Sequence, residues 1–102
     1  METSPALNER QKKHLRGLGH ALHPLVGIGQ HGLTDGVVAE LDRALTDHEL
    51  VKVRVRAGDR AERDLAFETL AGRTHSALVA RVGHVGLYFR PRSRASKIVL
   101  PA

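Results

Sequence analysis

Two kinds of residue in this sequence could hold a phosphate group: glycines that frame a short loop, and basic side chains that recur on neighbouring segments. The loop is Gly29-Gln30-His31-Gly32, between an apolar run and a helical pattern. Glycine allows positive φ and close approach of a ligand to the backbone, and unpaired amides at a helix start favour an anion. A Gly-x-x-Gly loop before a helix can clamp a nucleotide backbone. The loop therefore predicts a nucleic-acid docking point, with a plain tight turn as the alternative.

The loop itself brings no fixed positive charge, because Gln30 and His31 stand between its glycines. His31 could stack on a base or hydrogen-bond a phosphate, or simply be solvated. Asp35, in the first turn of the following helix, stabilises the helix dipole and would repel a phosphate. Attraction must therefore come mainly from basic residues elsewhere, and the candidates are Lys12, Lys13, Arg16, Lys52 and Arg54.

Other constellations are weaker. A second match, Gly83-His84-Val85-Gly86, lies between two predicted strands without a helix start, so we regard it as coincidental. Seven histidines invite a metal hypothesis, but no His-Glu-x-x-His pattern occurs, and no acid–base constellation supports an enzyme such as a nuclease. We expect no catalytic residue, no metal, no cofactor and no small-molecule substrate.

Composition agrees with a polyanionic partner. The 102 residues predict one domain with a formal net charge of +5, and the segment 77–102 carries basic residues but no acid. Cysteine is absent, which fits a reducing compartment. No segment is long and apolar enough for a membrane helix, and the polar first ten residues do not resemble a signal peptide. We expect a monomeric cytoplasmic protein without membrane contact.

The elements that would position these residues can be predicted from periodicity. Helical patterns cover residues 9–22, 34–48 and 61–74, and strand patterns cover 25–28, 50–57, 77–82 and 87–89. The second strand alternates, with three valines on one face and Lys52, Arg54 and Arg56 on the other, which is solvated unless the first helix covers it. The fold class is α/β: one compact α-β-α-β-α-β-β domain whose four-stranded mixed sheet is packed by helices. Because the connections between the first three strands contain helices, those strands can pair parallel.

Packing and termini can also be predicted. The first helix should bury Leu15, Leu18 and Leu22, and the third should bury a stripe of Leu65, Ala66, Thr69 and Leu70, with Phe67 also in the core. The folded domain should span residues 8–91. Residues 92–102 should form a loose basic tail, in which 98–100 could add an edge strand. The bases Arg90, Arg92, Arg94 and Lys97 would supply diffuse electrostatic contact.

Two runs, residues 15–34 and 48–55, resemble the YhbY family, the stand-alone form of the CRM domain (chloroplast RNA splicing and ribosome maturation). The resemblance spans roughly residues 10–91. It implies an RNA-binding fold similar to the C-terminal domain of translation initiation factor three, with the loop at Gly29–Gly32, basic strand positions at Lys52 and Arg54, and a basic first helix. The sequence departs from the family where Lys is usual in the loop, where His75 replaces a helix-ending glycine, and where Gly86 replaces an apolar strand residue.

The resemblance further implies association with RNA of the precursor large ribosomal subunit, in a pre-ribosomal particle, as an assembly factor that makes and breaks no bond. Aromatic residues are scarce, so recognition should rely on backbone and shape. The alternative from another class is a protein-interaction module that docks on a ribosomal protein or an assembly factor.

Overall fold

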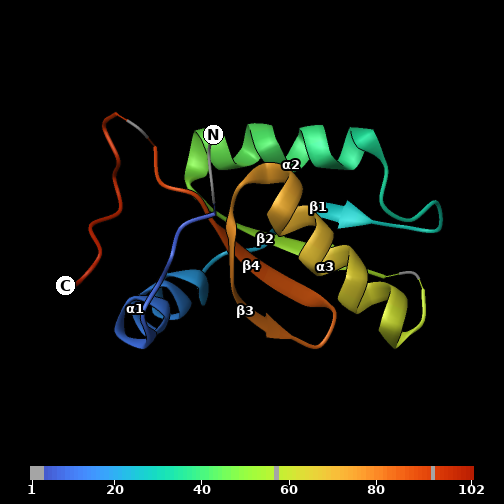
Figure 1. Ribbon diagram of the computed structural model, residues 1–102, viewed down its shortest axis with the longest axis horizontal. Coiled ribbons are helices and arrows are strands. Elements are labelled where there is room, and N and C mark those ends of the chain that lie inside the picture. Colours follow the sequence, from blue (N-terminus) through green and yellow to red (C-terminus); the bar gives the residue numbers. More distant parts are fainter. Residues whose placement is uncertain (1–3, 57, 93) are drawn as a thin grey trace.

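The seven elements follow the predicted order. The structure, a computed structural model, describes residues 4–56, 58–92 and 94–102, so Ala57 and Ser93, which fall in the predicted second strand and tail, lie outside the described residues. The elements are α1 (Glu9–Gly19), β1 (Pro24–Ile28), α2 (Asp35–His48), β2 (Leu50–Val55), α3 (Arg60–Thr74), β3 (Ala77–Val82) and β4 (Val85–Phe89) (Figure 1). Helix α1 ends three residues earlier than predicted, with His20 as its C-cap, because glycines at 17 and 19 weaken helical propensity.

The sheet is mixed, as predicted, with strand order β1-β2-β4-β3. Strand β1 pairs parallel with β2, and β4 pairs antiparallel with both β2 and β3. The expected parallel pairing of the second and third strands is therefore wrong. The β3–β4 hairpin inserts with β4 in the centre, because four of the five residues of β4 are buried while β3 ends in exposed residues.

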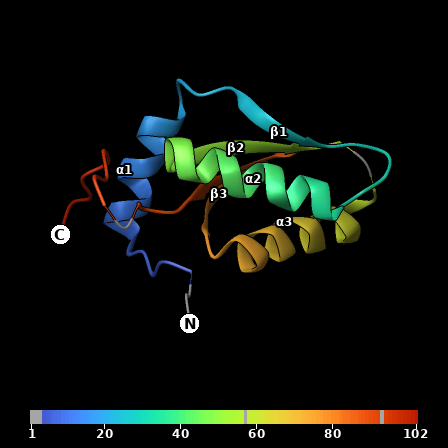
Figure 2. The same ribbon diagram turned by 90° about the horizontal axis from the view of Figure 1, so that it is seen from above.

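Helices cover both faces of the sheet. Helices α2 and α3 lie on one face (Figure 2) and enclose the main core, whose buried residues are Val26, Ile28, Leu41, Leu45, Val51, Val53, Val55, Phe67, Leu70 and Tyr88. Helix α1 contacts β2, β3 and β4 and covers part of the opposite face over a second cluster: Leu15, Leu50, Val79, Leu87 and Phe89. The sheet is thus fully covered on one side and only partly covered on the other.

Two predicted core positions are exposed. Leu65 is 69 % exposed, because α3 turns Phe67, Leu70 and Thr74 toward the sheet and places Leu65 on the outer side. Leu18 is 43 % exposed, since α1 rests on the sheet mainly through Leu15. His75, which stands where the family usually has a helix-ending glycine, is the C-cap of α3 and has φ of 54°, a left-handed conformation in which glycine would be less strained.

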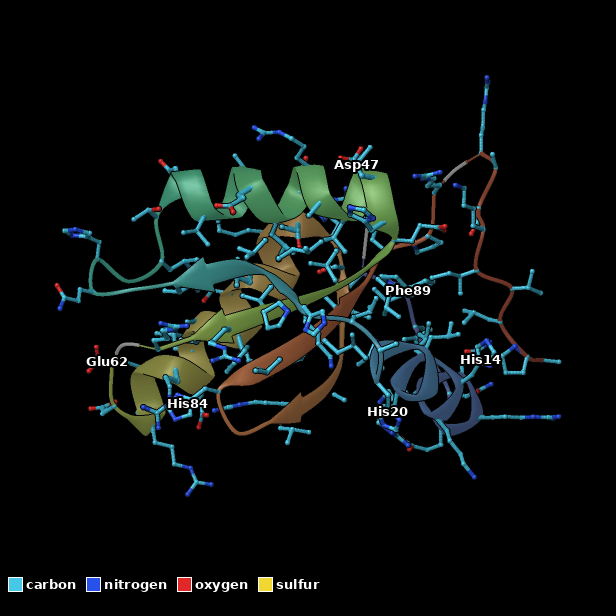
Figure 3. The ribbon with its side chains drawn as sticks, turned by 180° about the vertical axis from the view of Figure 1, so that it is seen from behind. His14, His20, Asp47, Glu62, His84 and Phe89 are labelled. Atoms are coloured by element: carbon cyan, nitrogen blue, oxygen red, sulfur yellow. The ribbon has the colours of Figure 1, made fainter. Side chains whose placement is uncertain are left out.

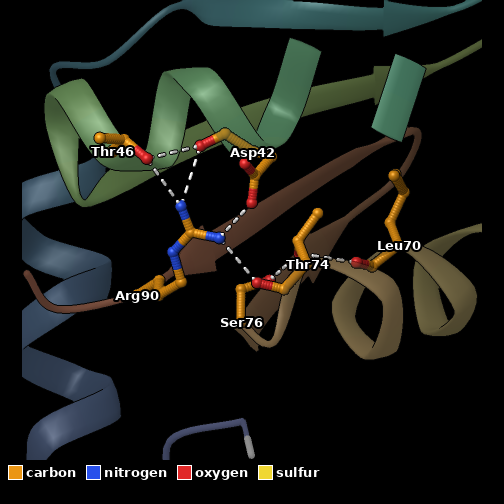
Figure 4. A network of polar contacts seen from close by, with 6 residues as sticks. All are labelled: Asp42, Thr46, Leu70, Thr74, Ser76 and Arg90. Carbon is orange, nitrogen blue, oxygen red and sulfur yellow. Dashed lines mark hydrogen bonds and ion pairs between the residues drawn. The ribbon is translucent and has the colours of Figure 1, made fainter. Parts of the chain in front are cut away.

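Arg90 joins the two helices of the main core (Figure 4). Its Nη1 donates to Asp42 Oδ1 at 2.6 Å and to the Thr74 carbonyl at 2.8 Å, and its Nη2 donates to Thr46 Oγ1 at 3.0 Å. Arg92 follows the same pattern, donating from Nε to the Thr46 carbonyl at 2.8 Å, near the C-terminal end of α2. The donors of these two arginines thus fasten the chain after β4 to α2, a structural role that the sequence did not predict, and their diffuse contact with RNA stays a prediction.

The C-terminal segment is docked around a buried carboxylate, so the expectation of a loose tail is wrong. Glu49, 1 % exposed, accepts from the Arg92 amide at 3.1 Å, from the Lys97 amide at 2.8 Å and from the Ser96 hydroxyl. Ile98 and Leu100 pack against the cluster under α1, and residues 98–100 form no strand. Burial raises the pKa of the Glu49 carboxyl, but the hydrogen bonds from Ser96, Lys97 and Arg92 outweigh it and hold that pKa below its usual range.

Replacing Glu49 by glutamine should therefore destabilise the fold in a pH-dependent way. Because the folded pKa lies below the unfolded one, the stabilisation is complete above the unfolded value of about 4.5 and is lost as pH falls through the folded pKa. We expect Glu49→Gln to lower the free energy of unfolding by roughly 1–3 kcal/mol near neutral pH. Urea titrations at several pH values should show this gap from the wild type closing on acidification.

The control is Glu40→Gln, which removes the same charge from an exposed position of α2 and should leave the stability near neutral pH almost unchanged. A gap for Glu49→Gln that stays constant down to low pH would contradict the role given to the carboxylate.

Candidate nucleic-acid interface

The basic face of β2 is open beside α1. Alternation turns Val51, Val53 and Val55 into the main core, while Leu50 lies in the cluster under α1. Lys52 is half-buried and Arg54 is exposed. The predicted alternation is confirmed, and α1 covers the beginning of this face without reaching Arg54.

A groove of about 320 Å³ lies between α1 and the sheet. The basic residues along it come from two elements: Arg16 from α1, and Lys52 and Arg54 from β2. The residues that line it are Arg16, Gly19, His20, Pro24, Lys52, Arg54, Ala80, Val82, Val85 and Leu87. Three cations and no acid among these residues make the groove a place of positive potential, suited to phosphate.

The Gly29–Gly32 loop follows β1 at the far end of the sheet from α1 (Figure 1). The Gly32 amide donates to the Gly29 carbonyl at 3.0 Å, and Gly32 has φ of 68°, a conformation that favours glycine. Gln30 and His31 are both exposed. The loop is thus a tight turn whose two central side chains face solvent. This geometry is compatible both with a nucleic-acid docking point and with the alternative of a plain tight turn.

The surroundings of the loop carry both signs of charge. The Arg56 amide donates to the Ile28 carbonyl at 3.0 Å, which keeps the chain after β2 beside the start of the loop. Asp35, expected to repel phosphate, is paired with Arg73 Nη2 at 3.0 Å. The loop also borders a second cleft of about 290 Å³, which is lined by Gln30, Gly32 and Glu62.

The structure brings only part of the predicted basic set together. The groove contains Arg16, Lys52 and Arg54. Lys12 instead lines another cleft near the end of α3, and its Nζ lies 3.7 Å from Glu9 Oε1. Lys13 is exposed and does not line the groove. The reason is that the two halves of α1 border different places: Lys12 faces the end of α3 and the start of β3, whereas Arg16 faces the groove over β2, β3 and β4.

Sequence reasoning missed the apolar part of the groove and His20. Figure 3 shows His20 beside α1, and His84 at the opposite end of the sheet near the start of α3. His20 lies one helical turn after Arg16, and this i, i+4 spacing was the available signal. Val82 and Val85 flank the hairpin turn, and nothing local in the sequence says which face they occupy.

The second Gly-x-x-Gly run has a structural role. It forms the β3–β4 turn, in which Gly83 has φ of 59°, and the ring Nδ1 of His84 lies 2.9 Å from the Val55 carbonyl oxygen. Gly86 is buried in β4 against the ring of Phe67. Its setting inside a hairpin agrees with the prediction that its resemblance to the first loop is coincidental.

Two properties of the described part of the chain bear on other classes of function. Within residues 4–56, 58–92 and 94–102, no group of three or more His, Asp or Glu side chains is placed to hold a metal ion. Across the same residues, each helix is too short or too polar to span a membrane.

A mixed α/β sheet with a partly open basic face defines a class of small domains suited to holding a polyanion. Within that class, the chain belongs to the CRS1/YhbY (CRM) domain family, whose model matches residues 7–90. The predicted resemblance is confirmed. This is a non-enzymatic family, in agreement with the expectation that the chain is not an enzyme.

Several relatives are similar over nearly their whole length. The chain is 43 % identical over 95 residues to an "RNA-binding protein" of Haemophilus influenzae, covering 93 % of this chain and 95 % of the relative. It is 39 % identical to a "Probable RNA-binding protein" of Pseudomonas aeruginosa, covering 90 % and 88 %. The solution structure of a hypothetical protein from Staphylococcus aureus superposes with a TM-score of 0.81 at 31 % identity, covering 94 % of this chain and all of that one, which confirms the fold.

Proposed function

We propose that this protein binds RNA, and that it assists assembly of the large ribosomal subunit by holding ribosomal RNA in the precursor particle. The observation that carries the proposal is the groove in which Arg16, Lys52 and Arg54 converge without an acid. The names of the relatives from Haemophilus influenzae and Pseudomonas aeruginosa support RNA as the polyanion. The ribosomal target rests on the family resemblance alone.

The proposed mechanism is positioning. The guanidinium groups and the ammonium group in the groove hold backbone phosphates, since charge-assisted contacts of this kind are strong but carry little sequence information. The Gly29–Gly32 loop adds a backbone docking point at the far end of the same sheet, where its exposed glycine framework lets a sugar–phosphate chain approach. No bond is made or broken, and the protein acts as a monomer in the cytoplasm.

The test is the salt dependence of binding to a structured ribosomal RNA fragment, measured by fluorescence anisotropy. Each neutralised phosphate contributes about −0.7 to −0.9 to the slope of log K against log salt, so three groove contacts predict a slope of about −2 or steeper. A salt-independent affinity would overturn the electrostatic mechanism.

Pull-down from nuclease-treated lysate separates this function from a protein-interaction module. The proposal expects ribosomal proteins to be lost from the tagged protein when RNA is digested. Their retention after complete digestion would favour direct docking on a protein partner.

A further inference from the structure

The groove has an apolar floor that phosphate binding does not require. The floor is formed by Ala80 and Val82 of β3 and by Val85 and Leu87 of β4. Val82 is 80 % exposed, although it lies on a strand beside other apolar side chains. Apolar surface that gathers in a concave site, with polar groups at its margin, is typical of a ligand-binding position.

The margin of the groove complements that floor. Arg16 and His20 come from α1 on one side, and Lys52 and Arg54 come from β2 on the other. Guanidinium planes and the imidazole ring can stack on a nucleobase, while ammonium and guanidinium groups attract the phosphates that flank it. A planar, weakly polar ring attached to an anionic backbone fits both parts of this surface.

We propose that the groove receives one unpaired nucleobase from a loop or single-stranded segment of the RNA, an inference that rests on the proposed function. The base covers Val82 and Val85, and Arg16, Lys52 and Arg54 contact the phosphates on either side of it. Bases inside a continuous duplex are stacked and cannot reach such a site, so the preferred RNA has an unpaired segment. The floor offers side chains without hydrogen-bonding groups, so discrimination among the four bases is small.

Three RNA probes of equal charge test this proposal: a hairpin, the same hairpin with abasic loop nucleotides, and a continuous duplex. Wild-type protein should bind the hairpin about tenfold more tightly than either of the others, the effect expected for stacking of one base. Ala80→Phe, which fills the groove, should reduce hairpin affinity to the abasic level without changing the salt slope. Val82→Thr, a milder change of similar shape at an exposed position, should lower the preference for the hairpin several-fold.

Ala39→Phe, which adds the same ring to an exposed position of α2, is the matched control and should bind all three probes as the wild type does. Thermal unfolding of each variant establishes that it folds. Equal binding of hairpin, abasic hairpin and duplex, with a steep salt slope, overturns the base site and leaves RNA binding standing. No binding to any of the three probes overturns the proposed function together with this inference.

Discussion

Lys52→Ala combined with Arg54→Ala is expected to weaken binding of structured RNA by about 30- to 160-fold, because each lost charge-assisted phosphate contact accounts for roughly 1 to 1.5 kcal/mol. The two side chains are two residues apart on β2, so they lie roughly 6.6 Å apart along the strand, and both line the groove with Arg16. Direct titration at about 0.1 M salt measures the loss. The slope of log K against log salt should also become shallower by about 1.4 to 1.8, because two phosphates are no longer neutralised.

The matched control removes the same net charge from positions outside the groove. Arg43 on α2 and Arg94 in the tail are both exposed, and neither lines the groove. Arg43→Ala with Arg94→Ala should weaken binding only a few-fold, through the general field of the protein. Equal losses in the two double variants would show that binding is diffuse and that the groove is not its centre.

Gly86→Ala is expected to be the most destabilising single methyl addition in this chain. A Cβ at position 86 would lie 2.7 Å from Cε1 and 2.8 Å from Cδ1 of Phe67, and 3.1 Å from Cε2 of Tyr88. Neither ring can move easily, since both side chains are fully buried and the Tyr88 hydroxyl donates to the Phe67 carbonyl at 2.8 Å. Overpacking of this kind costs about 1–3 kcal/mol, which in a domain of this size lowers Tm by roughly 5–20 °C.

Two further variants test the explanation. Gly72 is exposed within α3 and has open space around its added Cβ, so Gly72→Ala should raise stability by up to about 1 kcal/mol through helix propensity. Phe67→Leu should recover part of the loss when it is combined with Gly86→Ala, because the two sites share one space and their effects are not additive. Additive losses would rule out a steric clash between residues 67 and 86.

The sequence predicted the order of the elements because most of them carry their own periodicity. The valine alternation of β2 is a local signal that reappears in the structure. The start of α3 is local too, since Asp59 and Glu62 form a capping box three residues apart. The central place of β4 could not be predicted, since it depends on how the hairpin docks. The orientation of α3 likewise depends on the space that Gly86 leaves for Phe67.

Most of the predicted RNA-binding basic residues lie in two different clefts for a similar reason. Lys52 and Arg54 could be assigned to one face from alternation alone, whereas Lys12 and Arg16, one helical turn apart, border different clefts. That separation follows from the direction in which α1 crosses the sheet, which is a long-range property. The roles of Arg90 and Glu49 are also long-range, because Arg90 donates to Asp42 and Thr46, and Glu49 accepts from residues 92–97, each more than forty residues away along the chain.

The most direct test of the central claim is to map the RNA contact on the protein by NMR, following backbone amide shifts of labelled protein during titration with an RNA hairpin. If RNA binds in the groove, the largest changes are expected in the last turn of α1, at residues 52–54 of β2 and in the Gly29–Gly32 loop, with small changes on the outer faces of α2 and α3. Changes concentrated on the outer faces of α2 and α3, with the groove unaffected, would contradict binding in the groove.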